Sequence, residues 1–203
     1  MRTIASEPRT ADGGRAAVLP ARRAGAAPDG PDALAPDTLA PDALAPVGPD
    51  LFKAVFRNHA NGVAIITAGS DNPVGFCATS LTSLSLNPPL ASFTIDPSTT
   101  SWQTVQTAPH VMAHLLADNQ EPLAHTFATP GTPKFGPTTP WHRGIHDLPL
   151  LNGVLAWLAL ATTTHLPVGD HVLVIGRVVA AHHEPAGRPL IHHDRTFVRL
   201  VNP

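Results

Sequence analysis

The chain has 203 residues, a formal net charge of −2 and 43% hydrophobic residues. This length is typical of one domain, and the hydrophobic content is sufficient for a core. The charge is small and the basic residues are scattered, which excludes the electrostatic footprint of a nucleic-acid-binding protein. The single cysteine, Cys77, excludes an intramolecular disulfide framework.

Residues 1–49 are expected to be a disordered leader and linker. They are rich in Ala and Pro and contain no Phe, Trp or Tyr, so they cannot bury enough apolar area to offset the entropy of ordering. No export signal is predicted, because Ser6-Glu7-Pro8 interrupts the start of the chain at once. No segment approaches the roughly 20 apolar residues of a membrane span. We therefore expect a cytoplasmic protein, without membrane contact, whose one domain comprises residues 50–203.

The folded part is expected to open with a short amphipathic helix. Asp50 is placed to cap it, and apolar residues recur at spacing four from Leu51 to Phe56. Gly62 stands where the helix can end in a left-handed conformation. Six segments rich in β-branched residues and bounded by turn-forming residues are predicted strands: 63–67, 74–80, 90–95, 111–116, 154–163 and 171–181.

Two further helices are predicted, one within residues 98–107 and one starting at Asp118. In the second, Asp118 and Glu121 have capping-box spacing and Pro122 suits the first turn. Residues 129–149 hold five prolines and three glycines and are expected to form a long irregular loop. Many short strands with few helices between them favour a mostly β, antiparallel barrel, because parallel strands need long crossovers.

Hydroxyl side chains are concentrated in residues 79–85 and again in residues 98–101. Taken alone, this pattern is typical of strand edges, turns and helix caps, where Ser and Thr satisfy nearby backbone groups. The common enzyme signatures for dinucleotides, phosphates, nucleophilic serine and zinc are absent. Any function must therefore be recognised from the order of weaker motifs.

That order resembles the flavin reductase-like family of split β-barrels, which includes the small partners of two-component monooxygenases. The resemblance runs from about residue 52 to residue 197. Its pieces, in chain order, are NGVAIIT (61–67), GFCATSLTSLSLNPPL (75–90), FA (127–128), KF (134–135), PLLNG (149–153) and GDH (169–171). The resemblance implies a split antiparallel Greek-key β-barrel with a few short helices.

The resemblance also implies an activity. The protein would be an NAD(P)H-dependent flavin reductase that transfers hydride from NADH or NADPH to FMN or FAD. It would be a homodimer and would supply reduced flavin to a partner monooxygenase. Because the cofactor carries the reactivity, such a protein needs no general acid or nucleophile.

The resemblance further indicates which residues form the site. His171 would lie where the nicotinamide stacks on the flavin; the alternative is a histidine at the start of a strand whose partner is a neighbouring carboxylate such as Asp170. The phosphate would lie near Ser98 and Ser101, where a helix N-terminus favours an anion. Lys134 would offer it positive charge, although an exposed loop lysine would do nothing. The remaining predicted flavin contacts are Cys77, Thr79, Ser80, Leu81, Thr82 and Phe127.

Several positions depart from the family pattern. Relatives commonly have Thr at the position of Cys77, Asn or Ser at Thr79 and Phe at Leu81. Many relatives have Arg at Thr100, and loss of that contact costs about 1–3 kcal/mol. Near the C-terminus, the pair at His192 stands where relatives often have Tyr before a single His. We therefore expect weaker flavin binding, which suits a flavin that diffuses as a substrate.

These departures leave two other functions open. The first is a flavin-binding barrel that acts on another substrate, by redox or non-redox chemistry. The second is a ligand-binding barrel that has lost flavin and is not an enzyme. No metal site is predicted, because the histidine pairs at spacing four fall in strand or loop sequence, where they do not share a face.

Overall fold

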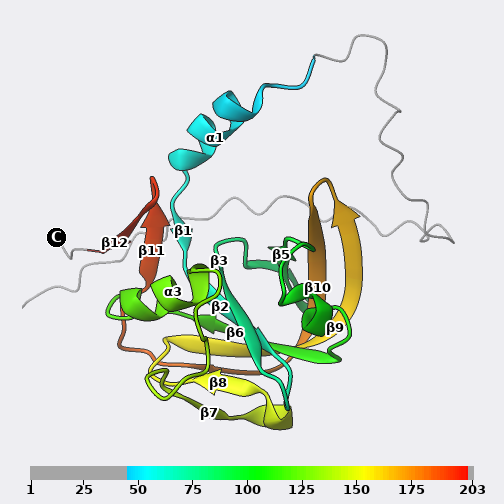
Figure 1. Cartoon of the computed structure of the whole chain (residues 1–203), viewed down its shortest axis with the longest axis vertical. Helices are drawn as coiled ribbons and strands as arrows, with labels where there is room; N and C mark the ends of the chain where they lie inside the picture. The colour runs from blue at the N-terminus through cyan, green and yellow to red at the C-terminus, as the bar shows by residue number, and fades with distance from the viewer. Residues whose placement is uncertain (1–44, 201–203) are drawn as a thin grey trace, which may run out of the picture. The chain divides into compact units, whose positions relative to one another are not determined.

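The computed structural model describes residues 45–200, and the compact folded unit begins at Val47 (Figure 1). The predicted leader lies almost wholly outside the described residues. The helices are α1 (Pro49–Arg57), α2 (Trp102–Val105) and α3 (Glu121–Ala128), with a 3-10 turn at Ile145–Asp147. The strands are β1 (Asn61–Gly62), β2 (Ala64–Ala68), β3 (Val74–Ala78), β4 (Thr82–Leu86), β5 (Pro89–Ile95), β6 (His110–Leu115), β7 (Trp141–Arg143), β8 (Pro149–Leu151), β9 (Ala156–Val168), β10 (His171–His183), β11 (Leu190–His193) and β12 (Thr196–Arg199).

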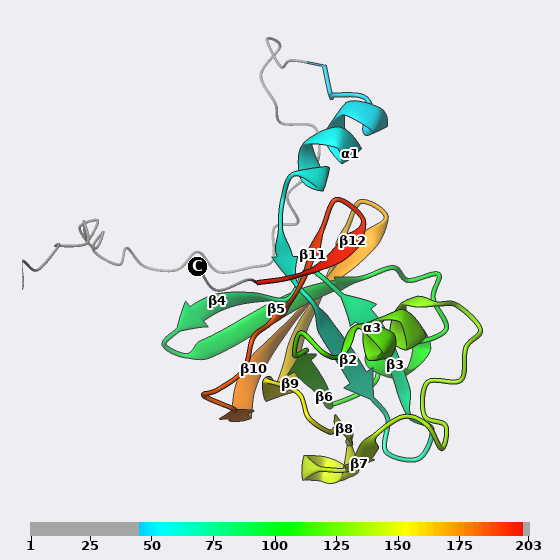
Figure 2. The ribbon, with the colours of Figure 1, turned by 90° about the vertical axis from the view of Figure 1, so that its left-hand side faces the viewer.

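Seven strands form one antiparallel sheet in the order β3-β2-β6-β9-β10-β5-β4. Its two edge strands, β3 and β4, follow one another in the chain, so the link between them brings the edges together. In that link the Ser80 hydroxyl accepts a hydrogen bond of 3.0 Å from the Thr94 amide of β5. The sheet therefore curves into a barrel that is split at this point. Figure 2 shows β4 and β5 as a long hairpin that extends away from the barrel.

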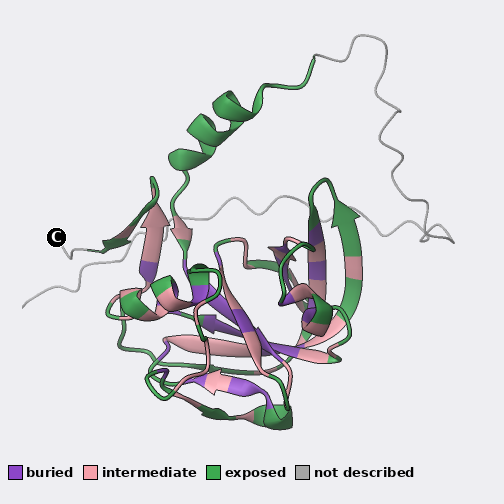
Figure 3. Ribbon diagram, viewed as in Figure 1, coloured by how far each residue is buried: buried purple, intermediate pink, exposed green. Residues whose placement is uncertain are grey.

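The barrel has apolar side chains on both faces of its central strands, and β2 is buried over its whole length (Figure 3). Ile66, Phe93 and Val174 belong to the cluster inside the curve of the sheet. Ile65 and Phe127 belong to a second cluster, which lies under α3. Since each buried side chain of this size contributes about 1.5–3 kcal/mol, the two clusters supply the main driving force for folding.

The prediction of a mostly β, antiparallel fold is confirmed, and each of the six predicted strands overlaps an observed one. Strands β9 and β10 run longer than expected. The other six strands were not predicted. β4 lies in the hydroxyl-rich segment, β1, β7 and β8 have only two or three residues each, and β11 and β12 form a hairpin. Asp194 and Arg195 turn that hairpin with φ of 44° and 67°. This left-handed geometry usually uses Asn-Gly, so the sequence lacks the ordinary hairpin signal.

The predicted helix ends were partly wrong. Gly48, not Asp50, is the N-cap of α1, and Gly62 lies in β1 rather than at the end of that helix. The capping box from Asp118 does not form, because Gln120 is the N-cap of α3 and its side chain accepts the Ala117 amide. Pro122 stands in the first turn of α3, as predicted.

The segment 129–149 is less irregular than expected. It contains β7, which pairs with β8, and the 3-10 turn. Phe135 stacks edge-on against Trp141 at 5.1 Å and against Phe127 at 5.5 Å. These aromatic contacts anchor the segment to the second core cluster in spite of its prolines. Among residues 45–200, no helix is long and apolar enough to cross a membrane.

A fully buried histidine, His114 of β6, joins three strands. Its Nδ1 lies 3.0 Å from the Ile65 carbonyl oxygen of β2, and its Nε2 accepts the Leu151 amide of β8 at 3.2 Å. One ring nitrogen donates and the other accepts, which requires the neutral imidazole with its proton on Nδ1. Burial lowers the pKa of His114 to about 4. The hydrogen bond to Ile65 raises this pKa, but by less than burial lowers it.

This burial predicts a pH dependence of stability. The unfolded chain binds a proton at His114 below about pH 6.5, whereas the folded chain does so only near pH 4. The contribution of neutral His114 to the free energy of unfolding is therefore complete above pH 6.5. As the pH falls toward 4, that free energy decreases by about 3 kcal/mol. Urea unfolding at pH 7 and at pH 4 measures this decrease in the free energy of unfolding. The variant His114→Asn cannot titrate but can still donate to Ile65, so its fall in unfolding free energy should be smaller by that amount. Equal falls would contradict the prediction.

A glycine allows α3 to pack closely against β3. A Cβ atom at Gly75 would lie 2.6 Å from a ring carbon of Phe127, well inside contact distance. Phe127 is only 2% exposed and is enclosed by the second cluster, so its ring has little room to move away.

Gly75→Ala should therefore lower the unfolding free energy by about 1–3 kcal/mol through overpacking. The matched control is Gly136→Ala, since a Cβ atom at Gly136 meets nothing within 4 Å. Thermal unfolding of the two variants and the parent chain measures the difference. If both substitutions had the same small effect, the ring of Phe127 would not be held against β3.

Candidate functional site

A groove of about 400 Å³ lies between β3, the 98–101 turn and the end of α3, and is called the hydroxyl groove here. It brings together four predicted site residues from three separate segments: Ser98, Ser101, Phe127 and Lys134. Its full lining is Gly75, Phe76, Ser98, Thr99, Thr100, Ser101, Phe127, Ala128, Thr129, Pro130, Gly131 and Lys134. Its size falls within the usual range for a small-molecule site.

Lys134 is held at one wall of this groove. Its Nζ donates to the carbonyl oxygens of Thr126 and Thr129, each at 2.5 Å. An ammonium group has three protons, so one remains for a ligand. Partial burial lowers the pKa of Lys134, and the nearby Cys77 sulfur opposes that shift. A cation fixed in this way suits a phosphate group.

The 98–101 turn differs from what was expected. The Asp96 carboxylate accepts the Ser98 amide at 2.8 Å, and hydrogen bonds from the Ser98 side chain and backbone lower the pKa of Asp96. Ser98 is thus already bound to an anion. Thr99 donates to the Asp96 carbonyl at 2.7 Å. Within residues 45–200, the hydroxyls of Thr100 and Ser101 make no such bond, so they are the donors available in this turn.

A helix does begin after this turn, as expected, but it is short. Helix α2 has only four residues, Trp102–Val105, and Ser101 before it already has helical angles. So short a helix adds little to the electrostatic potential. Attraction of an anion must therefore come from hydroxyls and from Lys134.

The residues at the end of β3 alternate in direction, so that Gly75, Cys77 and Thr79 share one face. Cys77 packs against the second core cluster. Burial raises the pKa of Cys77 to about 11, although Lys134 acts in the opposite sense. The thiol stays protonated at neutral pH, and its role is that of a small apolar group beside the groove.

The link from β3 to β4 carries the other predicted contacts. Ser80 closes the barrel through Thr94, as described above. Leu81 packs its side chain against the first core cluster. Thr82 is exposed on β4 and lies 3.4 Å from the Ser80 carbonyl oxygen. Any contact of Ser80 or Leu81 with a ligand would therefore come from the hydroxyl proton or from the backbone.

His171 begins β10 and is exposed. Its Nδ1 lies 2.7 Å from the Asp170 carboxylate, and this hydrogen bond is the main cause that lowers the pKa of Asp170. Since the carboxylate can only accept, Nδ1 carries the proton and Nε2 is left for a ligand. Val172 pairs with Ile95, which places His171 beside Asp96 and the 98–101 turn. The structure thus brings His171 to the same end of β5 as the hydroxyl groove.

A second hollow was not anticipated from the sequence. It has a volume of about 340 Å³, lies between α1, Thr79 and the turn of the β11–β12 hairpin, and is called the basic hollow here. Its lining is Phe52, Lys53, Phe56, Arg57, His59, Asn61, Thr79, His192, Asp194 and Arg195. Sequence reasoning missed it because the hairpin itself was not predicted.

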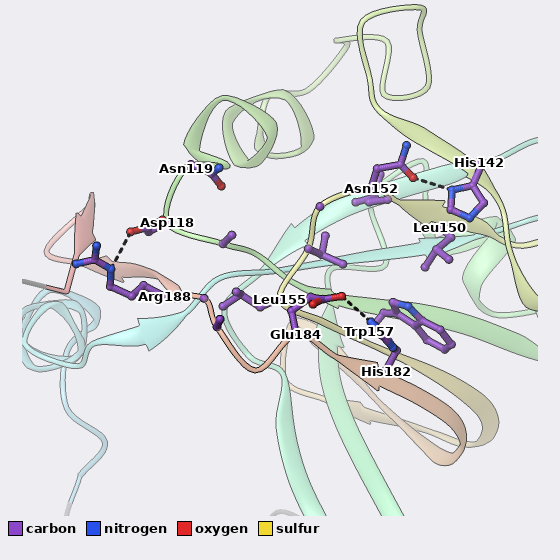
Figure 4. A pocket seen from close by; sticks show the side chains of 16 residues that line it. Asp118, Asn119, His142, Leu150, Asn152, Leu155, Trp157, His182, Glu184 and Arg188 are labelled. Atoms are coloured by element: carbon purple, nitrogen blue, oxygen red, sulfur yellow. Dashed lines mark hydrogen bonds and ion pairs between the residues drawn. The ribbon is translucent and has the colours of Figure 1, made fainter.

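A third hollow, of about 560 Å³, is larger than the other two and contains none of the predicted residues (Figure 4). Its polar groups are paired with one another. Glu184 contacts His182 at 2.9 Å, and Asp118 contacts Arg188 at 3.7 Å. Two carboxylates against one arginine disfavour a nucleotide phosphate. This hollow is therefore a poorer candidate than the hydroxyl groove.

The residues of the hydroxyl groove fit a flavin nucleotide. Gly75 and Phe76 of β3, backed by the buried Phe127, give the groove an apolar wall for a flat, largely apolar ring. Ser101, Thr100 and Lys134 provide donors for the ribityl hydroxyls and phosphate.

Comparison with known proteins agrees with this reading. Residues 56–200 match the family model described as the flavin reductase like domain. The NADH:FMN oxidoreductase of Rhodococcus qingshengii is 37% identical over 153 residues, which cover 73% of this chain and 80% of that protein. The reductase component of a 4-nitrophenol 4-monooxygenase/4-nitrocatechol 2-monooxygenase from Rhodococcus opacus is 34% identical over 156 residues, covering 74% and 83%.

Solved structures show the same fold. The NADH:FAD oxidoreductase of Streptomyces globisporus, determined in complex with NAD and FAD fragments, superimposes with a TM-score of 0.72. Its sequence identity is 29%, and the match covers 78% of this chain and 98% of that one. The family resemblance predicted from the sequence is confirmed, and the chain belongs to the flavin reductase-like domain family.

Proposed function

We propose that this flavin reductase transfers hydride from NADH or NADPH to FMN or FAD and releases the reduced flavin to a partner monooxygenase. The observation that carries the proposal is the convergence of Phe127, Ser101 and Lys134 on one groove at the end of β5 where His171 lies. The names of the Rhodococcus relatives support FMN, NADH and a monooxygenase partner. A cytoplasmic location remains a prediction from the sequence.

Each side chain has a distinct part in this proposal. Bound flavin supplies the hydride acceptor. Phe127 backs the wall of the groove from the core, and Cys77, Thr79 and Thr82 belong to the segment that leads from the groove to β4. The free donors of Ser101 and Lys134 hold the phosphate, while the engaged Ser98 orders the turn through Asp96.

His171 is proposed to orient the nicotinamide. Asp170 fixes the imidazole with Nδ1 protonated, so that Nε2 is presented as an acceptor. The carboxamide of nicotinamide has an N–H₂ group that such an acceptor can hold. This role is one of positioning, because hydride moves directly between the two rings.

His171→Ala should lower kcat/KM for NADH by about 10- to 100-fold, since one hydrogen bond to a held substrate is lost. The dissociation constant for FMN should not change. The matched control is His183→Ala, an exposed histidine at the other end of β10. NADH oxidation with added FMN, and flavin fluorescence quenching, measure the two quantities.

The outcomes separate the possible functions. Full activity of His171→Ala would contradict the nicotinamide role. A parent chain that binds flavin but oxidises neither NADH nor NADPH would favour a flavoprotein that acts on another substrate. Failure to retain flavin at all would favour a ligand-binding barrel without catalysis.

We further propose that the protein is a homodimer. Helix α1 has no buried residue and projects from the barrel (Figures 1 and 3). Leu51 and Val55 lie one turn apart on one stripe of this helix, and each is 59% exposed. An apolar stripe of this kind marks a protein contact, and a second copy is the simplest partner.

Val55→Glu should convert the dimer to a monomer, because it places a charge in the apolar contact. Ala54→Glu adds the same charge to the same helix outside the stripe and should leave the dimer intact. Light scattering after size-exclusion chromatography measures the mass of each. A parent chain that is monomeric at micromolar concentration would refute the proposal.

A further inference from the structure

The basic hollow between α1 and the β11–β12 hairpin carries an inference about the substrate. We propose that it binds the adenosine diphosphate part of a dinucleotide, while the reacting ring of that dinucleotide lies at the hydroxyl groove. The inference rests on the proposed reductase function. Of the site residues predicted from the sequence, only Thr79 lines this hollow, and the inference assigns the hollow a role.

Positively charged side chains gather around the basic hollow. The described residues contain eight Lys and Arg side chains, and three of them line this one hollow: Lys53, Arg57 and Arg195. None of the three forms an ion pair within residues 45–200, and Asp194 is the only carboxylate in the lining. Unpaired cations gathered on a chain of net charge −2 create a local attraction for a polyanion.

Two of the other cations are engaged elsewhere. Lys134 donates to two backbone carbonyls, and Arg188 contacts Asp118 and a carbonyl. The hydroxyl groove therefore has one cation with one free proton, which is sufficient for a single phosphate. The pyrophosphate of a dinucleotide needs a second cationic site, and the basic hollow provides it.

Aromatic side chains are the second observation. The rings of Phe52 and Phe56 lie 4.7 Å apart, and the ring of His59 meets Phe56 at 6.2 Å. Both phenylalanines are 54% exposed, although apolar side chains of this size are usually buried. An aromatic surface beside cations is the combination on which a purine base stacks while its phosphates are neutralised.

The position of the hollow is the third observation. Thr79 directly follows β3, and Gly75, four residues earlier in that strand, lines the hydroxyl groove, roughly 13 Å away by strand geometry. The neighbouring Ser80 is bonded to Thr94, which pairs with Leu173, two residues from His171. This pairing places the Ser80 link roughly 10 Å from His171. A dinucleotide is long enough to join the two places.

Adenosine diphosphate occurs both in the nicotinamide dinucleotides and in FAD. Steady-state kinetics with shortened substrates distinguish these sources. NADH is compared with reduced nicotinamide mononucleotide while FMN is the acceptor, and FAD is compared with FMN while the mononucleotide is the donor. The variants are Lys53→Glu and Arg195→Glu, and the matched control is Arg177→Glu, which is exposed on β10 outside the hollow.

If the hollow holds the nicotinamide dinucleotide, both variants raise KM for NADH by about tenfold or more and leave the mononucleotide unaffected. If it holds FAD, the effect moves to KM for FAD. In either case Arg177→Glu behaves like the parent chain. Equal use of long and short substrates by the parent chain, or equal kinetics in parent and variants, would overturn the inference.

Binding without turnover provides a separate readout. Isothermal titration calorimetry of ADP with flavin-free protein should show binding to the parent chain. The dissociation constant for ADP should rise by about tenfold in Arg195→Glu and stay unchanged in Arg177→Glu. If the parent chain reduces no flavin, the proposed function fails while this titration still decides the inference. If flavin is reduced but ADP binding is the same in all three proteins, the inference fails and the function stands.

Discussion

The hydrogen bond from the Thr94 amide of β5 to the Ser80 hydroxyl fastens the link between the two edge strands of a seven-stranded sheet, and the positions of the functional residues depend on that closure. Because β3 and β4 are consecutive strands at opposite edges, the short link between them must cross from one edge to the other. That crossing turns Leu81 into the core and leaves Thr79 facing α1 and the C-terminal hairpin. The same closure brings the end of β5 to the base of the hydroxyl groove.

The distribution of charge complements this architecture. The hydroxyl groove has a single partly buried cation, Lys134, which two carbonyls hold in place. The basic hollow has three cations that protein groups leave unpaired. His171 lies near the carboxylates of Asp170 and Asp96, and its hydrogen bond to Asp170 fixes the orientation of its ring. Under the two proposals above, nucleotide phosphates bind at these two places, and the uncharged nicotinamide lies beside His171.

The candidate site could be predicted only in part. Motif order indicated Phe127, Lys134 and His171 as candidates, because each belongs to a short motif in a family-like arrangement. It could not show that Ser98 is engaged by Asp96, since two residues of separation suit a turn contact and a ligand contact equally well. It also missed Arg195, whose role depends on a hairpin turn at Asp194 that has left-handed angles without glycine or asparagine.

By itself the sequence determined the class of fold, six of the seven strands of the large sheet and the family, because β-branched runs, turn residues and motif order are local properties of the chain. Only the tertiary structure decided which polar groups remain free. The pairing of Val172 with Ile95, the seat of His114 between three strands, and the approach of Phe127 to Gly75 all join residues far apart in sequence. Hydrogen-bond and steric competition of this kind acts through space, so it can be judged only when the partners are in place.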